Sequence, residues 1–228
     1  MVVCQIPRPE TGCMSYLISD PGAGVCAVVD PTDDVRKFVD EAARLDLRIE
    51  RVLETHTHAD HLSGARALST DLSVPLHFPF LSQATYAHEA ISDHGRVRVG
   101  DVEVRAVHTP GHTPDHMTFV LEETALVGDA LLIGTVGRAD FYDRGPEELY
   151  HSLFDKILKL SDSTVVFPAH YGPRHGLPED RFTTIGRERR FNEALTQATK
   201  EDFVRYMTEG WPPKPSGWES IVERNTRT

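Results

Sequence analysis

This chain of 228 residues is poor in cysteine and contains no long hydrophobic run. Its three cysteines, Cys4, Cys13 and Cys26, are odd in number, crowd at one end and lack CxxC spacing. We therefore expect reduced structural thiols rather than a disulfide framework or a thiolate metal site. No stretch approaches the ~20 apolar residues of a membrane span, and the first residues lack a basic region followed by an apolar run. We accordingly expect a soluble, cytoplasmic protein without a membrane partner.

Positive charge is also scarce. The chain has 24 lysine and arginine residues against 35 aspartate and glutamate residues, which gives a formal net charge of −11 at pH 7. Nucleic-acid binding normally needs a concentrated basic face, so this charge balance argues against a nucleic-acid partner. An anionic small molecule must then be held by a local group of arginines. The basic run at 187–191 lies on a predicted helix, where we expect a solvated face.

The hydrophobic pattern predicts short strands with helices between them. Strands are expected at 14–18, 26–30, 51–54, 74–78 and 164–167, and hairpins at 97–107 and 117–129. Helices are expected at 34–46, with Asp33 or Asp34 as the cap, and at 61–72, 146–160, 182–195 and 200–207. Because hairpins imply antiparallel pairing, a sheet-on-sheet core with outer helices fits better than a regular βαβ repeat. We expect a single domain over 1–228, with an extended tail from about residue 210.

Three histidines and an aspartate lie within the seven residues THTHADH at 55–61, directly after a predicted strand. Imidazoles and carboxylates are the usual ligands of zinc and iron. Burying them without a metal or full hydrogen bonding would cost on the order of several kcal/mol, so the cluster predicts a metal site. Three further donors follow later strands or turns: His112, Asp129 and His170. We expect the other histidines to be ordinary core or surface residues: His77, His88, His94, His108, His116, His151 and His175.

The order HxHxDH, then a distant His, an Asp and a His, resembles the metallo-β-lactamase superfamily. The resemblance spans about residues 55 to 170. It implies an α+β fold, a four-layer αββα sandwich with the metal site at one edge of the sheets. It does not identify the reaction, because one fold carries many functions. In hydrolases such as glyoxalase II, seven ligands hold two metals for attack on a thioester. In persulfide dioxygenases, three ligands hold one ferrous ion.

Three segments resemble persulfide dioxygenases in particular: ETHTHADHLSG, TPGHTPDHMTFVL with GDALLIGTVGRADF, and FPAHYGPR. The long type of glyoxalase II also carries a helical C-terminal domain, for which this chain is too short. Compact glyoxalase-II-like hydrolases share a GRTD-type stretch with residues 137–141, so a dinuclear thioester hydrolase, with zinc as a possible metal, stays the alternative. A closed structural zinc module is disfavoured, because such sites are usually rich in cysteine.

The preferred resemblance implies oxidation of glutathione persulfide, or the persulfide of another small thiol, by O₂ and water to sulfite and the thiol. One Fe(II) per chain would be held by His56, His112 and Asp129. Four residues would support these ligands by hydrogen bonds or hold a second metal: His58, Asp60, His61 and His170. Three residues are expected to bind the glutathione carboxylates: Arg138, Tyr171 and Arg174. The oligomeric state stays open, a homodimer included.

Overall fold

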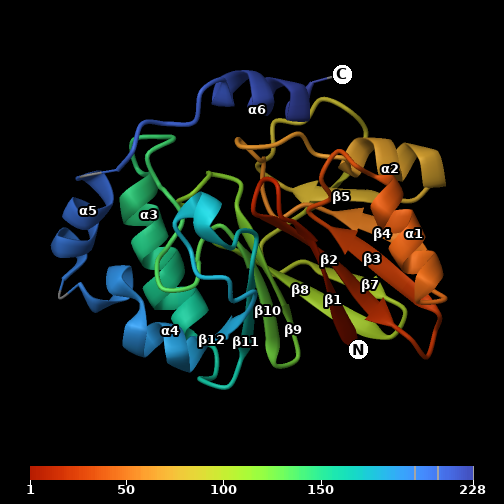
Figure 1. The fold of residues 1–228 in the computed structure, drawn as a ribbon, viewed down its shortest axis with the longest axis horizontal. Helices are drawn as coiled ribbons and strands as arrows, with labels where there is room; N and C mark the ends of the chain where they lie inside the picture. The colour runs from red at the N-terminus through yellow and green to blue at the C-terminus, as the bar shows by residue number, and fades with distance from the viewer. Residues whose placement is uncertain (198, 210, 228) are drawn as a thin grey trace.

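The computed structural model describes residues 1–197, 199–209 and 211–227, and these residues form two six-stranded sheets packed face to face (Figure 1). The first sheet has the strand order β1 (Val2–Arg8), β2 (Cys13–Asp20), β3 (Val25–Val29), β4 (Arg48–Leu53), β5 (Leu76–Pro79) and β6 (Glu89–Ile91). The second has the order β12 (Thr183–Thr184), β11 (Val165–Pro168), β10 (Thr124–Gly128), β9 (Met117–Leu121), β8 (Val102–His108) and β7 (Arg96–Val99).

Helices cover the outer face of each sheet (Figure 1). Outside the first sheet lie α1 (Arg36–Arg44) and α2 (Ala65–Leu72). Outside the second lie α3 (Gly145–His151), which continues through a π-helical turn (Ser152–Lys156) and a 3-10 turn (Ile157–Lys159), α4 (Ile185–Phe191) and α5 (Lys200–Thr208). The last helix, α6 (Trp218–Thr226), lies across one edge of the sandwich. This order of layers confirms the predicted four-layer αββα sandwich.

Strand β2 illustrates why the sequences of the central strands are mostly apolar. Its Tyr16 and Ile18 point into the core between the two sheets, where they meet residues of the second sheet such as Phe119. Leu17, between them, packs on the other face against Phe38 of α1. Since successive side chains of a strand alternate between faces, a strand covered on both sides needs apolar residues at every position.

Both predicted hairpins are present as the antiparallel pairs β7–β8 and β9–β10. The pairs β3–β4, β4–β5, β5–β6 and β10–β11 are parallel, with α1 and α2 as crossovers of the first sheet. Parallel neighbours end at the same edge of a sheet. The segments that follow β3, β4, β10 and β11 therefore come together at one edge, which is where the candidate metal ligands lie.

Two local predictions are wrong. Helix α1 begins after Val35 without a side-chain cap, because Asp33 instead forms an ion pair with Arg8. The tail from about residue 210 is not extended throughout, since α6 occupies its last part. Asn225 of that helix donates hydrogen bonds to the carbonyl oxygens of His58 and His61, at 3.0 and 2.9 Å, and these contacts hold the helix on the histidine segment.

The strand β1 is an element that the hydrophobic pattern did not predict. It pairs with β2 along its whole length and forms the edge of the first sheet.

Among the described residues, no helix has both the length and the apolar character that a membrane crossing requires.

Candidate metal centre

Three groups of metal-ligand side chains lie at this edge of the sandwich, and within each group the ligand atoms are no more than 4.8 Å apart. The first contains His56, His112 and Asp129. The second contains Cys13, Asp60, His61 and His170. The third contains Asp30, Glu54 and His58. The seven donors predicted from the sequence are thus brought together, but they are divided among separate groups.

The first group combines two histidines and one carboxylate, a donor set that suits a divalent transition-metal ion. Asp129 Oδ2 lies 3.7 Å from His56 Nε2 and 3.5 Å from His112 Nε2. His112 Nδ1 donates to the carbonyl oxygen of Arg138 at 2.8 Å, which turns Nε2 toward Asp129. His56 Nε2 is buried without a hydrogen-bond partner. A buried nitrogen without a hydrogen-bond partner beside a carboxylate is typical of a metal ligand, so these residues fit a divalent transition-metal ion.

The charge states of this group also suit a cation. Burial, together with the neighbouring imidazoles, holds the pKa of His56 well below its usual value, so its ring is neutral. A neutral imidazole is the form that binds metals. Burial alone would raise the pKa of Asp129, but the charge and hydrogen bond of His170 hold it well below its usual value. The group therefore offers a neutral imidazole at His56 and a carboxylate at Asp129 beside the Nε2 of His112.

Two glycines allow the backbone to approach Asp129. Gly128 has φ +49°, and a Cβ there would lie 2.4 Å from His116 Nε2. A Cβ on Gly137 would lie 1.9 Å from the carbonyl oxygen of Asp129. The loop after β10 can therefore fold back over Asp129 only with glycine at these positions.

His116 supports the first group, although the sequence pattern did not distinguish it from ordinary core histidines. It is fully buried, and its ring stacks on that of His56 with centroids 5.0 Å apart. Its Nε2 accepts a hydrogen bond from the backbone N–H of Asp129 at 3.0 Å, and its Nδ1 lies 2.9 Å from Thr109 Oγ1. The sequence signal that could have indicated this role is its position, four residues after His112.

The ring of His58 lies 4.2 Å from that of His56, and its Nδ1 is buried without a hydrogen-bond partner, whereas its Nε2 faces away from the first group. Its Nε2 lies 3.0 Å from Glu54 Oε2 and 3.5 Å from Asp30 Oδ1, and all three side chains are buried. Burial would lower the pKa of His58, but the charge of Glu54 and the hydrogen bond to Asp30 raise it well above its usual value. Ser63 Oγ also donates a hydrogen bond to Glu54 Oε1, which helps to hold the carboxylate that faces His58. The two histidines of the HxH motif therefore face different partners.

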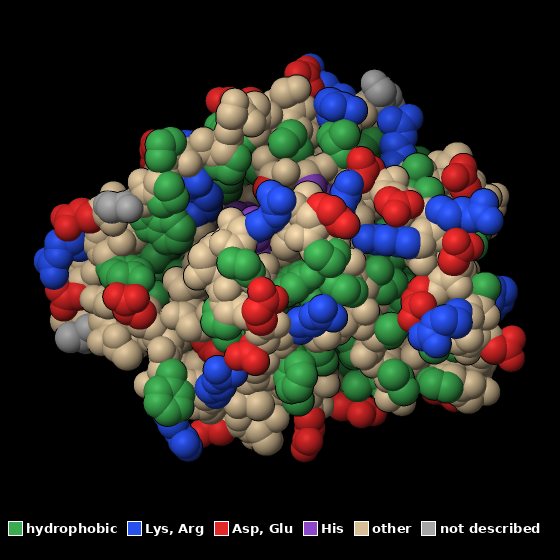
Figure 2. All heavy atoms as spheres, viewed as in Figure 1, with side chains coloured by type: hydrophobic (Ala, Val, Ile, Leu, Met, Phe, Trp, Pro, Cys, Tyr) green, Lys and Arg blue, Asp and Glu red, His purple; other side chains and the backbone are tan. Residues whose placement is uncertain are grey.

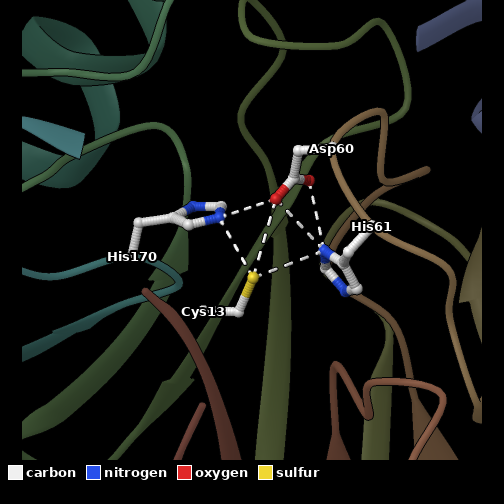
Figure 3. A group of neighbouring side chains, drawn as sticks. All are labelled: Cys13, Asp60, His61 and His170. Atoms are coloured by element: carbon white, nitrogen blue, oxygen red, sulfur yellow. Dashed lines mark hydrogen bonds and ion pairs between the residues drawn. The ribbon is translucent and has the colours of Figure 1, made fainter. Parts of the chain in front are cut away.

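The second group adds a residue for which the sequence predicted no such place. Cys13, at the start of β2, lies with its Sγ between His61 and His170 (Figure 3). Burial alone would raise the pKa of this thiol, but its hydrogen bonds with His170 and His61 lower it to about 6. The cysteines are free, as expected, but the sequence did not predict that Cys13 would join a group of possible metal ligands. The other two cysteines, Cys4 and Cys26, are free and lie away from this group.

A cleft of about 810 Å³ opens onto the first two groups. His112, Asp129, Asp60 and His170 line its floor, and Arg174 lies in its wall. In the space-filling view, histidine side chains are visible within a hollow that has lysine or arginine side chains around it (Figure 2). The C-terminal tail also contributes to the wall through residues that were not predicted to lie there: Trp211, Pro212, Pro213 and Pro215.

Of the three residues predicted to bind substrate, Arg138 and Arg174 line the cleft and Tyr171 does not. Arg138 lines the cleft, but its guanidinium is paired with both oxygens of Asp140, at 2.7 and 2.9 Å. It also donates to the carbonyl oxygens of Pro212 and Pro213, at 3.0 and 3.3 Å. Arg138 therefore fastens the tail to the loop after β10, and most of its five N–H donors are already used.

Tyr171 does not line the cleft. It is 5% exposed and packs in the core between the sheets, with the guanidinium of Arg181 5.3 Å from its ring centre. The prediction that Tyr171 reaches the mouth of the metal site therefore differs from its observed position. His175 was predicted to be ordinary, yet it lines the cleft, and its ring lies 4.3 Å from that of His170.

Comparison with known proteins adds to this geometry. Residues 8–78 and 81–170 match the family described as the Metallo-beta-lactamase superfamily. The human protein named Persulfide dioxygenase ETHE1, mitochondrial, is 32% identical over 98% of this chain and 87% of its own length. A probable metallo-hydrolase of Burkholderia pseudomallei is 30% identical over 88% of this chain and 83% of its own length. The crystal structure of ETHE1 from Myxococcus xanthus superposes with a TM-score of 0.92 at 30% identity, and covers 99% of this chain and 98% of that one.

Proposed function

Because this chain belongs to the metallo-beta-lactamase superfamily, with persulfide dioxygenases among its relatives, we propose that it oxidises glutathione persulfide with O₂ and water. The products are glutathione and sulfite. The terminal sulfur loses four electrons and O₂ accepts four. Water supplies the third oxygen of sulfite, the S–S bond breaks, and glutathione leaves as the thiol.

The observation that carries this proposal is the group of His56, His112 and Asp129 in a chain whose relatives include persulfide dioxygenases. Glu54 and Asp30 hold the Nε2 of His58 outside this group. Two histidines and one carboxylate would leave positions on a bound ferrous ion open for substrate and O₂.

Each residue of the first group has a defined task. Fe(II), when bound, supplies positions for the persulfide sulfur and O₂ and carries the electron transfer between them. His112 presents Nε2 because its Nδ1 donates to the carbonyl oxygen of Arg138. Asp129 is oriented by His170, which bonds Oδ1 at 2.7 Å and leaves Oδ2 facing His56 and His112. Such supporting hydrogen bonds determine how ligands are oriented and how basic they are.

The wall of the cleft supports a role in holding the glutathione carboxylates. Arg174 lies on a short 3-10 turn (Pro173–His175) directly after His170 and has no ion-pair partner among the described residues. A free guanidinium at the entrance suits a bidentate carboxylate contact. Arg138 would act chiefly by keeping the tail in the wall, with its remaining donor free for substrate.

Replacing Arg174 by alanine is expected to raise KM for glutathione persulfide about tenfold, which corresponds to about 1.4 kcal/mol, with little change in kcat. Steady-state O₂ uptake measures both constants. Arg190→Ala, which removes an exposed arginine of α4, is the matched control and should leave KM unchanged. Arg138→Ala should also raise KM, because it releases the tail. If KM were unchanged in both Arg174→Ala and Arg138→Ala, this cleft would not be the binding site of glutathione persulfide.

The reaction itself is tested with protein purified without oxygen and with its iron quantified. Glutathione persulfide should cause O₂ uptake and an equivalent amount of sulfite, with about one iron per chain at the first group. S-Lactoylglutathione is assayed in parallel for thioester hydrolysis. Hydrolysis without O₂ uptake would contradict the proposal and select the dinuclear hydrolase, which the similarity to a probable metallo-hydrolase keeps in view.

A further inference from the structure

We propose that a second, smaller pocket beside the first group binds small apolar molecules and delivers O₂ to the metal while the persulfide fills the main cleft. This side pocket has a volume of about 200 Å³ and lies between α6 and the loops that precede β9 and follow β10. The inference rests on the proposed oxidation, because that reaction consumes O₂. Binding to the pocket can nevertheless be measured without any activity.

The lining of the side pocket is mostly apolar. Its apolar and aromatic residues include Ala59, Leu81, Phe141, Tyr142, Trp218 and Val222. Leu81 is 46% exposed, so this end of the pocket meets the solvent. An apolar cavity of about 150 Å³ takes up xenon or benzene, and O₂ resembles xenon in being small, uncharged and without a dipole. The side pocket therefore suits a small apolar molecule in size and in lining.

The polar residues of the lining contribute little polar surface to the side pocket. Asp115 Oδ2 accepts hydrogen bonds from the backbone N–H and the hydroxyl of Thr57, at 3.0 and 2.6 Å. The hydroxyl of Thr226 donates to the carbonyl oxygen of Val222 at 2.8 Å. Asp115 Oδ1 and Thr113 Oγ1 lack a partner among the described residues, but both atoms are buried and are not exposed to the pocket. The space thus has few groups that would hold water in place.

The floor of the side pocket lies directly beside the first group. Thr57 follows His56 in the chain, and Thr113 follows His112, and both threonines are buried residues of the lining. A molecule that enters the pocket therefore reaches the two loops that carry the histidines of the first group.

Phe141 and Ala59 form the partition between the side pocket and the main cleft, since both residues line both spaces. The ring of Phe141 meets the ring of His112 edge-on, with centroids 5.4 Å apart, and lies 5.1 Å from the ring of Trp218. The side chain of Ala59 is a single methyl group, so the partition is thin there. Rotations of partly exposed side chains are fast, on the order of picoseconds to nanoseconds, so Phe141 can open a transient path for O₂.

Two separate entrances are useful because the two substrates differ in size. Glutathione persulfide, in the proposed reaction, occupies the main cleft of about 810 Å³ and covers His112 and Asp129 from that side. O₂ that arrives after the persulfide then needs another path. Pockets for drug-sized ligands measure about 300–1,000 Å³, so the side pocket is too small for a glutathione derivative. The side pocket therefore excludes the larger substrate and admits the smaller one.

Binding is tested with crystals of the full-length protein pressurised with xenon. Xenon should appear in the side pocket between Phe141, Trp218 and Val222. Val222→Phe, which fills the pocket from α6, should abolish this xenon peak. Ile221→Phe makes a similar change at the neighbouring residue of α6, outside the lining, and should retain it. A wild-type crystal without xenon in the side pocket would overturn the proposal.

Delivery is tested by O₂ uptake of the iron-loaded enzyme at saturating glutathione persulfide. Val222→Phe should lower kcat/KM for O₂ by about tenfold and lower kcat much less, because a narrower path slows the capture of O₂ rather than later steps. Ile221→Phe should match the wild type. Leu81→Trp narrows the exposed mouth and should act in the same direction, which keeps the test decisive if Val222→Phe folds poorly.

The two proposals fail in different ways. Wild-type O₂ uptake that stays unchanged in both Val222→Phe and Leu81→Trp would overturn delivery through the side pocket and leave the proposed oxidation intact. A wild-type protein that consumes no O₂ with glutathione persulfide would overturn the oxidation, and delivery of O₂ with it.

Discussion

Replacing Asp129 by asparagine should remove iron from the first group and lower kcat/KM for glutathione persulfide by at least about 10³-fold, which corresponds to about 4 kcal/mol. Asp129 is the one carboxylate of this group, and its Oδ2 faces both His56 and His112. An amide of the same shape carries no charge and is a poor ligand. It also replaces the anion that His170 contacts. Iron content and O₂ uptake are measured on the same anaerobic preparation.

Two variants serve as comparisons for Asp129→Asn. Asp60→Asn changes a neighbouring carboxylate outside the first group and should leave about one iron per chain. His58→Ala should also retain this iron, with activity lowered only about 10–100-fold, because His58 supports the site from a distance. If His58→Ala lost the iron as completely as Asp129→Asn, His58 would be a ligand. The arrangement would then be that of the hydrolases.

Replacing Asp30 by alanine should lower the free energy of unfolding of the metal-free protein by about 3–5 kcal/mol. Asp30 is 3% exposed, and its carboxylate accepts hydrogen bonds from the backbone N–H and the hydroxyl of Thr55, both at 2.7 Å. It also faces the raised-pKa imidazole of His58. Alanine would leave these donors buried and unpaired. It also adopts the left-handed backbone conformation of residue 30, φ +50°, less readily than aspartate does. Urea unfolding followed by circular dichroism measures the change.

The control for Asp30 is Asp33→Ala, three residues further along the same segment. Asp33 forms a partly exposed ion pair with Arg8, so its loss should cost less than about 1 kcal/mol. Asp30→Asn should lie between the two, because asparagine tolerates the left-handed backbone and keeps one acceptor oxygen. Equal losses for Asp30→Ala and Asp33→Ala would show that the buried contacts of Asp30 do not stabilise the cluster.

Much of the fold could be predicted because its signals are local. The hairpins β7–β8 and β9–β10 have alternating or apolar strands around a short turn, and α5 follows a helical pattern. The strand β1 and the helix α6 were not predicted. α6 is held by contacts with residues far away in the chain, such as those of Asn225 with the carbonyl oxygens of His58 and His61. Local patterns carry no information about such partners.

The candidate site shows the same division. The sequence by itself determined the kinds of donor, since clustered histidines and aspartates after strands have few uses other than metal binding. Only the tertiary structure decided which donors face one another. It turned His58 toward Glu54 and Asp30, and it brought Cys13 to His170 across 157 positions of the chain. The physical reason is that a ligand's direction depends on the hydrogen bonds and backbone pairing around it, and these partners come from both sheets.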